Sequence, residues 1–182
     1  MRLARAPPKV IGFSAPKQSG KTTAGRYLVE KWGYTIHSFA TPLKKLCNEY
    51  FGLTPEETFG VDKETVNPQW GVSPRQIMQF VGTDMFREKL GELVGMDLAS
   101  QFWIRQLVLS ELSVIDDIRM LNELEYVRDH GGLLVKIKRL RSSSSTECHS
   151  TEQELPDDLF DVIIYNDGTL DELYGQLDKL LQ

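Results

Sequence analysis

Cysteine is scarce in this sequence, which contains only Cys47 and Cys148, far apart and without the spacing of a metal site. A disulfide scaffold is therefore not expected, and a reducing compartment such as the cytoplasm fits the composition. Long apolar runs are also lacking, since none approaches the roughly 20 residues that a membrane-spanning helix needs. We therefore expect a cytoplasmic protein without a membrane partner.

Excess positive charge is lacking as well. The formal net charge is -5 at pH 7, which disfavours long-range attraction to a nucleic-acid polymer. An acidic protein that binds a polyanionic ligand must gather its cations locally, so clusters of Lys and Arg carry weight. The length of 182 residues, with 41% hydrophobic and 26% charged residues, suits one soluble α/β domain with a single core.

Short β-branched segments alternate with segments of helical periodicity. We expect strands at about 9–14, 34–38, 112–117, 132–138 and 160–165. We expect helices at about 22–32, 41–50, from Ser73-Pro74 onward, 97–109, 121–130 and 170–181. Residues 51–72 are rich in Gly and Pro, and 139–156 are polar. The alternation predicts an α/β fold whose mainly parallel sheet, of about five strands, is covered by helices on both faces and binds ligands at its carboxyl edge.

Residues 15–22, Ala-Pro-Lys-Gln-Ser-Gly-Lys-Thr, follow the first expected strand and open the first expected helix. This is the context of a phosphate-binding P-loop, and it predicts a three-layer αβα P-loop NTPase fold. Gly20 would let the backbone approach phosphate oxygens, Lys21 would reach the β- and γ-phosphates of ATP, and the Thr22 hydroxyl would ligate Mg²⁺. The remaining expected ATP contacts in this segment are Ala15, Lys17, Ser19 and Thr23.

Ala15 stands where the usual P-loop pattern has glycine. Alanine fits if this residue keeps a negative φ, whereas with a positive φ its Cβ would cost about 1–2 kcal/mol. The alternative interpretation of the whole segment is a Gly/Ser turn that caps an ordinary helix.

A second phosphate-handling segment is predicted where the strand at 112–117 ends in acids. Asp117, with Asp116 as the second choice, would hold Mg²⁺ directly or through a water molecule. Arg119 follows closely enough to pair with a substrate phosphate. The alternative is that Asp117 caps the next helix. Glu123, four residues after Arg119, would form an ion pair with it and orient it.

Several segments, in their order and spacing, resemble the bacteriophage deoxynucleoside monophosphate kinases from about residue 9 to 175. They are the P-loop, 38–44, 74–87, Trp103, 117–123, Gly131-Gly132, 149–152 and 166–173. The departures are Ala15 and a serine-rich stretch before His149. The resemblance implies a single P-loop kinase domain over 1–182. Its core would lie at about 9–38, 112–138 and 159–182, with a helical monophosphate-binding insertion at about 40–110 and a lid at about 139–157.

The resemblance also implies an acceptor site in the insertion. Arg75 would grip the acceptor phosphate with its guanidinium fork, or it is a solvated charge on a helix face. Arg87 would be a second phosphate contact or a surface ion pair, and Trp103 would stack on a base or belong to the core. Polar residues on the same helix, Asp84 among them, would contact base or sugar. The expected substrate-binding set is Lys44, Arg75, Gln76, Gln79, Thr83, Arg87, Trp103 and Glu152.

Two arginines begin the polar segment after the fourth expected strand. By the resemblance, Arg139 and Arg141 belong to a lid and would stabilise the transferring phosphoryl group. Without it, they are solvated residues at a strand end. The expected catalytic set is Lys21, Asp117, Arg119, Arg139 and Arg141.

Other positions have roles that the resemblance leaves open. His149 and Glu152 would shape the lid or the sugar site. Asn166 and Gly168 would contact the ATP base, or they form a plain turn, because Asn-Asp-Gly favours turns.

The implied reaction is ATP + dNMP → ADP + dNDP, with Mg²⁺ as cofactor and with ATP and dNMP as partners. No nucleic-acid polymer or membrane partner is expected, a homodimer is left open, and the location would be the host cytoplasm if the protein is viral. One alternative is another small-molecule P-loop kinase, similar to phosphomevalonate or dephospho-coenzyme-A kinases. The other is a nucleotide-binding regulatory module that has no phosphoryl acceptor.

Overall fold

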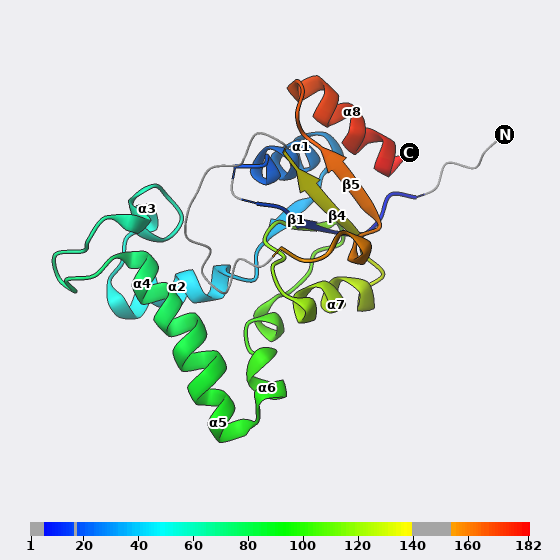
Figure 1. Ribbon diagram of the computed structural model, residues 1–182. Helices are drawn as coiled ribbons and strands as arrows, with labels where there is room; N and C mark the ends of the chain where they lie inside the picture. The colour runs from blue at the N-terminus through cyan, green and yellow to red at the C-terminus, as the bar shows by residue number, and fades with distance from the viewer. Residues whose placement is uncertain (1–5, 17, 140–153) are drawn as a thin grey trace. The chain divides into compact units, whose positions relative to one another are not determined.

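The chain forms two compact units, Met1–Ser38 together with Leu109–Gln182, and Phe39–Val108. The computed structural model describes residues 6–16, 18–139 and 154–182. Within these ranges no helix combines the length and the apolar character that crossing a membrane requires. The first unit contains the sheet, and the second is helical (Figure 1).

The first unit is built on a five-stranded parallel sheet, as expected. Its strands are β1 Val10–Ser14, β2 Thr35–His37, β3 Ser113–Ile115, β4 Leu133–Lys138 and β5 Val162–Tyr165. Their order is β2-β3-β1-β4-β5, and every neighbouring pair is parallel. Because all five strands run the same way, their carboxyl ends lie at one edge of the sheet, where α/β folds bind ligands.

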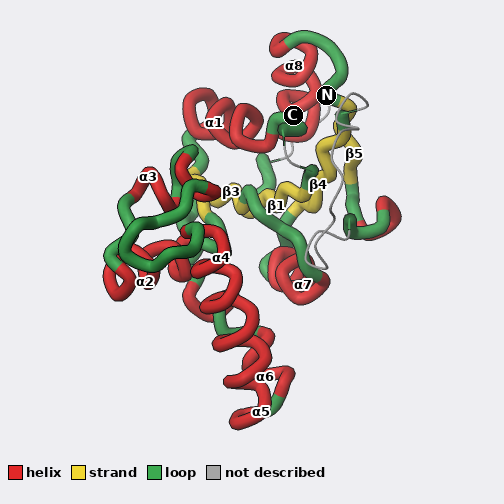
Figure 2. Tube along the Cα trace, turned by 60° about the vertical axis from the view of Figure 1, so that its left-hand side comes forward, coloured by secondary structure: helices red, strands yellow, loops and turns green. Residues whose placement is uncertain are grey.

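Helices cover both faces of this sheet, which confirms the expected three layers. Helices α1 (Lys21–Trp32) and α8 (Leu170–Leu181) lie on one face, and α7 (Leu121–Asp129) lies on the other (Figure 2). The core beneath α1 and α8 includes Phe13, Leu28 and Leu177, all fully buried. Burial on both faces explains why β1 has a nearly continuous apolar sequence rather than an alternating one.

Gly12 of β1 packs closely against Ile118, which follows β3. A Cβ on Gly12 would lie 2.4 Å from Ile118 Cδ1, so any larger residue here would force the Ile118 side chain to shift. The Ile118 amide also donates to the Phe13 carbonyl at 3.1 Å. These contacts fix the chain immediately after β3 against the end of β1, from which the phosphate loop departs.

The second unit packs several helices around a small apolar core. They are α2 Thr41–Phe51, α3 Pro55–Thr58, α4 Pro74–Gln79, α5 Leu90–Val94 and α6 Met96–Ser100. The core consists of Cys47, Leu53, Ile77 and Val81, with Leu43 and Phe86 among the residues packed against it. The Gly- and Pro-rich stretch at 51–72 contains α3 and a 3-10 turn, Asp62–Glu64.

A π-helical segment, Phe80–Lys89, joins α4 to α5. The expected start of this helix is confirmed, because the Ser73 hydroxyl accepts from the Gln76 amide and Pro74 occupies the first turn. The sequence predicted ordinary helical spacing beyond this start. A turn of a π-helix holds more residues than a turn of an α-helix. A step of four residues therefore falls short of a full turn here, whereas in an α-helix it exceeds one.

The helix expected at 97–109 is wrong in length. The structure has α6, which ends at Ser100, and a separate 3-10 turn, Ile104–Gln106. In the residues between them, the Phe102 ring lies 4.5 Å and the Trp103 ring 5.1 Å from the Phe86 ring, measured between centroids.

Candidate active site

The phosphate loop connects β1 to α1 through a tightly bent backbone. Gln18 has φ 65° and Gly20 has φ 102°, both in the left-handed region. Gln18 is the one non-glycine residue with such a φ in the described part of the chain, so Ala15 avoids the strain that glycine would relieve. Helix α1 then begins at Lys21 with its amino end directed at the loop and with no acid in its first turn. This arrangement favours an anion.

Ser19 is turned into the protein, not toward a ligand. It is 1% exposed, and its hydroxyl donates to the Pro16 carbonyl at 2.7 Å. The Ser19 carbonyl accepts a hydrogen bond from Asn166 Nδ2 at 2.9 Å. The Ser19 backbone amide also donates to the Pro16 carbonyl, at 3.3 Å, so Ser19 braces the loop with both its side chain and its backbone.

Lys21 bends back over the loop that precedes it. Its ammonium donates to the Ala15 carbonyl at 3.0 Å. Burial lowers the pKa of Lys21, the positive charge of Arg119 acts in the same direction, and the carboxylates of Asp117 and Asp116 oppose them. Two cations and two anions thus influence one another around the loop. The negative charge of a bound polyphosphate would favour the charged form of Lys21.

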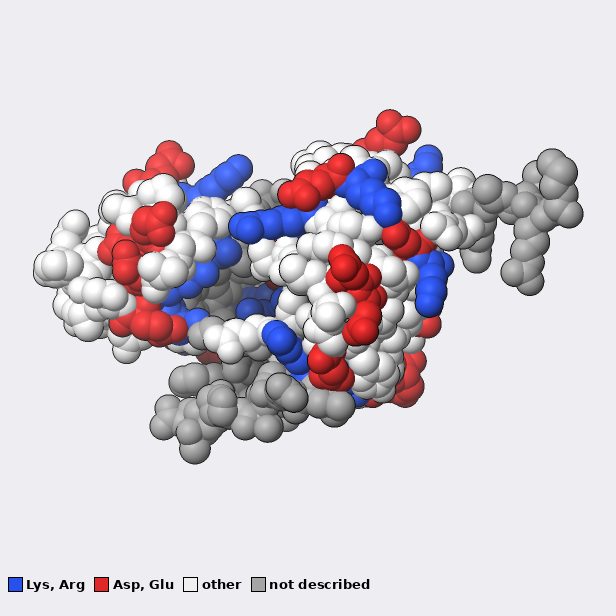
Figure 3. All heavy atoms as spheres, turned by 90° about the horizontal axis from the view of Figure 1, so that it is seen from above, with Lys and Arg blue, Asp and Glu red and all other residues white. Residues whose placement is uncertain are grey.

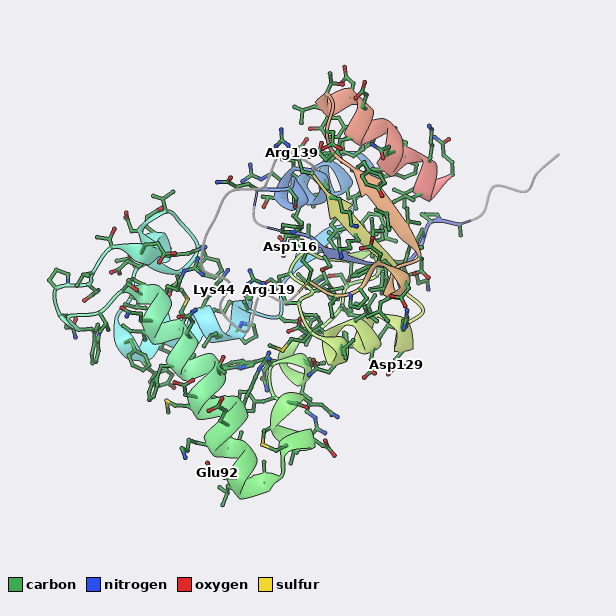
Figure 4. The ribbon with its side chains drawn as sticks, in the orientation of Figure 1. Lys44, Glu92, Asp116, Arg119, Asp129 and Arg139 are labelled. Carbon is green, nitrogen blue, oxygen red and sulfur yellow. The ribbon has the colours of Figure 1, made fainter. Side chains whose placement is uncertain are left out.

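The acidic pair follows β3 at the carboxyl edge of the sheet. The Asp116 amide donates to the His37 carbonyl at 3.1 Å, which extends the pairing of β2 with β3 by one residue. Asp117 accepts from the Ser38 hydroxyl at 2.6 Å. Both acids are half-buried. Figure 4 labels Asp116, Arg119 and Arg139, each of which follows a strand at this edge.

The residues expected to hold Mg²⁺ lie on two elements of the first unit. Thr22 is in the first turn of α1 and Asp117 follows β3. In the described part of the chain, no three His, Cys, Asp or Glu side chains form a metal-binding group. A hydroxyl and a carboxylate nevertheless fit Mg²⁺, because this ion takes few protein oxygens and completes its shell with water and phosphate.

Glu123 orients Arg119 through the backbone. It is 5% exposed, and its carboxylate accepts from the amides of Arg119 at 2.8 Å and Met120 at 3.1 Å. Because Arg119 precedes the first residue of α7, the helical i,i+4 spacing assumed from the sequence does not apply. Glu123 also caps α7, the role that the sequence offered to Asp117 as its alternative.

Of the other residues expected around ATP and in the lid, the structure describes only some. Arg139 is exposed and directly follows β4. Asn166 is buried and Gly168 is exposed, and both lie in the turn between β5 and α8. The remaining candidates, Lys17, Arg141, His149 and Glu152, lie outside the described residues.

The expected acceptor residues all fall in the second unit, except Glu152. Lys44 on α2 lies 4.7 Å from the centre of the Phe59 ring. On α4, the Arg75 guanidinium pairs with Glu64. The Gln76 side chain accepts from the Ser73 amide at 2.9 Å, so its carbonyl oxygen already caps the helix.

Gln79, Thr83 and Arg87 continue along the helix that begins with α4, and each is half-buried. Trp103 has the second of its two expected roles. It is 5% exposed and donates from its indole nitrogen to the Gly82 carbonyl at 3.1 Å. It therefore belongs to the core of the unit and does not offer a face to a base.

Sequence reasoning missed Ser38 as a member of the site. The available signal was its position, directly after a strand whose carboxyl end adjoins that of the acidic strand. The partner of the Asn166 side chain was missed as well, and no pattern in the sequence indicates a contact over 147 residues.

The parallel sheet, the phosphate loop and the charged cluster around Lys21 define a P-loop phosphotransferase. A family model described as deoxynucleotide monophosphate kinase matches residues 50–177 of this chain. A protein of Acanthamoeba polyphaga mimivirus, provisionally named a deoxynucleotide monophosphate kinase, is 36% identical over 181 residues, covering 92% of this chain and 93% of that protein. The chain belongs to the deoxynucleotide monophosphate kinase family.

Two further comparisons agree with this assignment. The deoxynucleotide monophosphate kinase of Escherichia phage RB69 is 28% identical over 142 residues, which cover 73% of this chain and 54% of the phage protein. The chain therefore matches about half the length of that relative. The crystal structure of shikimate kinase from Bacteroides thetaiotaomicron superimposes with a TM-score of 0.51 at 15% identity, covering 94% of this chain and 97% of that one, and it supports the fold alone.

Proposed function

We propose that this protein transfers the γ-phosphoryl group of ATP to a deoxynucleoside monophosphate, giving ADP and a deoxynucleoside diphosphate. The observation that carries the proposal is the position of Lys21 in a chain of this family. Its ammonium is held 3.0 Å from the Ala15 carbonyl, beside the amino end of α1 and within the field of Arg119, Asp116 and Asp117. This is the set of charges that phosphoryl transfer requires.

ATP would bind to the first unit. The backbone amides of the loop and of the first turn of α1 would contact the phosphates, and Lys21 would leave the Ala15 carbonyl for the β- and γ-phosphates. Thr22 and Asp117 would hold Mg²⁺, which neutralises charge on the phosphates. Arg119 and the exposed Arg139 would stabilise the charge that builds up as the phosphoryl group moves.

The acceptor would bind to the second unit. Arg75 is the proposed phosphate contact, because its guanidinium can grip two oxygens at once, and its present partner Glu64 is 61% exposed and easily replaced. Lys44, Gln79, Thr83 and Arg87 are proposed to complete the site. The acceptor phosphate is already an anionic nucleophile, so Asp117 would position and stabilise charge and would not need to act as a strong base.

The proposed partners are ATP and a deoxynucleotide, and not a nucleic-acid polymer. On the α8 side of the first unit, acidic and basic side chains are interspersed and form no extended field of one sign (Figure 3). Together with the net charge of -5, this disfavours binding of a polyanionic chain on that side.

A coupled assay of ADP release tests the proposal. Purified protein with Mg²⁺ and ATP would be given each deoxynucleoside and ribonucleoside monophosphate in turn, with phosphomevalonate and dephospho-coenzyme A as the competing acceptors. We expect ADP release that depends on at least one deoxynucleoside monophosphate. Release that depends only on a competing acceptor, or release that needs no acceptor at all, would overturn it.

A further inference from the structure

Asn166 is held between the end of the sheet and the phosphate loop. It directly follows β5, is 9% exposed, and its backbone amide donates to the Lys138 carbonyl at 2.8 Å. Its side-chain nitrogen donates to the Ser19 carbonyl at 2.9 Å. Asn166 is thus bonded through both its backbone and its side chain and is buried from solvent. It therefore has little conformational freedom left to lose when it binds the Ser19 carbonyl.

Gly20 shows how closely the amide fits against the loop. A Cβ on Gly20 would lie 2.3 Å from Asn166 Nδ2, a distance that no real side chain reaches. Gly20 also has φ 102°, which other residues rarely adopt. The glycine of the P-loop is therefore required for a second reason besides its backbone angle, namely the space that Asn166 occupies.

The hydrogen bond sets the direction of the next backbone donor. The peptide between Ser19 and Gly20 is planar and trans, so its carbonyl and its N–H point in opposite directions. When Asn166 holds the Ser19 carbonyl on its side, the Gly20 N–H must point away from Asn166. A phosphate loop acts through amides that are aimed before the ligand arrives, so this bond would preset one of them.

We propose that Asn166 is a positioning residue that fixes the phosphate loop in its ATP-binding conformation. This rests on the proposed function only in that the loop binds ATP phosphates. This role differs from the contact between Asn166 and the ATP base that the resemblance implied, because the side-chain nitrogen already donates to the Ser19 carbonyl. It also links the turn after β5 to the loop after β1, across β4.

The test compares Asn166→Ala with the wild-type protein by calorimetric titration of ATP, thermal unfolding and steady-state kinetics. Loss of the bond leaves a buried carbonyl without its donor, so we expect the Kd and KM for ATP to rise about tenfold. The KM for the deoxynucleotide should stay within about twofold. Asn166→Asp should weaken ATP binding at least as much, since its carboxylate would face the Ser19 carbonyl with no proton to donate.

Gln176→Ala is the matched control. Gln176 is also an amide that donates to a backbone carbonyl, that of Tyr165 at the end of β5, at 3.0 Å. Among the described residues, this bond does not involve the phosphate loop. We expect this variant to lose some thermal stability and to keep its ATP affinity. If Asn166→Ala likewise lost only stability, or if both KM values rose equally, the positioning role would be wrong.

Two safeguards keep the outcomes distinct. If Asn166→Ala does not fold, Asn166→Ser keeps a small polar group and is compared in the same way, with the same expected loss of ATP affinity. If the wild-type protein binds ATP but phosphorylates no deoxynucleotide, the proposed function fails, while the calorimetric comparison still decides the role of Asn166.

Discussion

The Ser38 hydroxyl donates to Asp117 Oδ2 at 2.6 Å. Ser38 follows β2 and Asp117 follows β3, two strands that pair in register with His37 opposite Ile115. The bond therefore spans the carboxyl edge between neighbouring strands and fixes the rotation of the carboxylate. Because Asp117 acts on the charge of Lys21, this rotation also affects the phosphate-binding end of the site.

Ser38→Ala should lower kcat about tenfold and raise the Mg²⁺ concentration required for half-maximal rate. The bond to a charged acceptor is worth roughly 1.5–3 kcal/mol, and its loss leaves the carboxylate free to turn. Ser38→Thr keeps the hydroxyl and should retain most of the activity. Steady-state rates measured over a range of Mg²⁺ concentrations check this, and an alanine variant with wild-type kcat and Mg²⁺ dependence would show that Asp117 needs no such support.

Lys21→Ala should reduce kcat by at least about 100-fold, because it removes the cation that is held within the phosphate loop. Lys31→Ala is the matched control. It removes the same charge from the far end of α1, where Lys31 forms an exposed pair with Asp178 at 2.7 Å. We expect less than a twofold change in kcat for the control. Near-normal turnover by Lys21→Ala in the coupled assay would contradict the role of Lys21.

The affinity for ATP should fall at alkaline pH earlier than an ordinary lysine would predict. Burial lowers the pKa of Lys21 below its usual 10.5, so in the free protein its ammonium deprotonates at lower pH. Only the charged form attracts phosphate, so affinity is complete well below the lowered pKa and declines as pH rises through it. Titrations of ATP from neutral pH to about 10 check this against Lys21→Arg, whose guanidinium stays charged throughout and should give a flatter profile.

The sheet and the phosphate loop could be predicted from the sequence because both depend on local patterns. The buried apolar run of β1, the Gly20-Lys21 pair and the helix behind it are all specified within about 25 residues. The acids after β3 were found for the same reason, since they directly follow a short apolar strand.

The remainder of the site depends on contacts between distant segments. Asn166 meets Ser19 across 147 residues, and Ser38 meets Asp117 across 79. Neither spacing has a periodicity that a sequence can reveal. The core position of Trp103 likewise involves its contacts with Phe86 and the Gly82 carbonyl, which depend on how the second unit folds.

Arg75→Ala should raise the KM for the deoxynucleotide about tenfold or more and change the KM for ATP less than twofold. A guanidinium that holds a phosphate through two charged hydrogen bonds is lost, while the phosphate loop is untouched. Arg75→Lys should not restore the KM, because an ammonium cannot make the same forked contact. Steady-state kinetics with each substrate varied in turn give both KM values.

Glu64→Ala separates this role of Arg75 from that of a surface ion pair. Glu64 pairs with Arg75 and is 61% exposed, so the pair itself should add little to stability. We expect Glu64→Ala to leave the deoxynucleotide KM unchanged or lower it. Equal effects of the two variants, or a larger rise in the ATP KM for Arg75→Ala, would place Arg75 outside the acceptor site.

Tyr34→Phe should flatten the loss of stability between about pH 10 and pH 12. Tyr34 is 2% exposed, its hydroxyl donates to the Pro8 carbonyl, and burial raises its pKa to about 12. An unfolded tyrosine ionises near pH 10, so above that value the unfolded state gives up its proton while the folded state retains it. The stabilisation is therefore complete below about pH 10 and is lost as pH approaches 12. Thermal unfolding across this range checks it. Tyr165→Phe, at a side chain that is 53% exposed, should leave the wild-type slope intact, and a Tyr34→Phe slope equal to wild type would contradict the assignment.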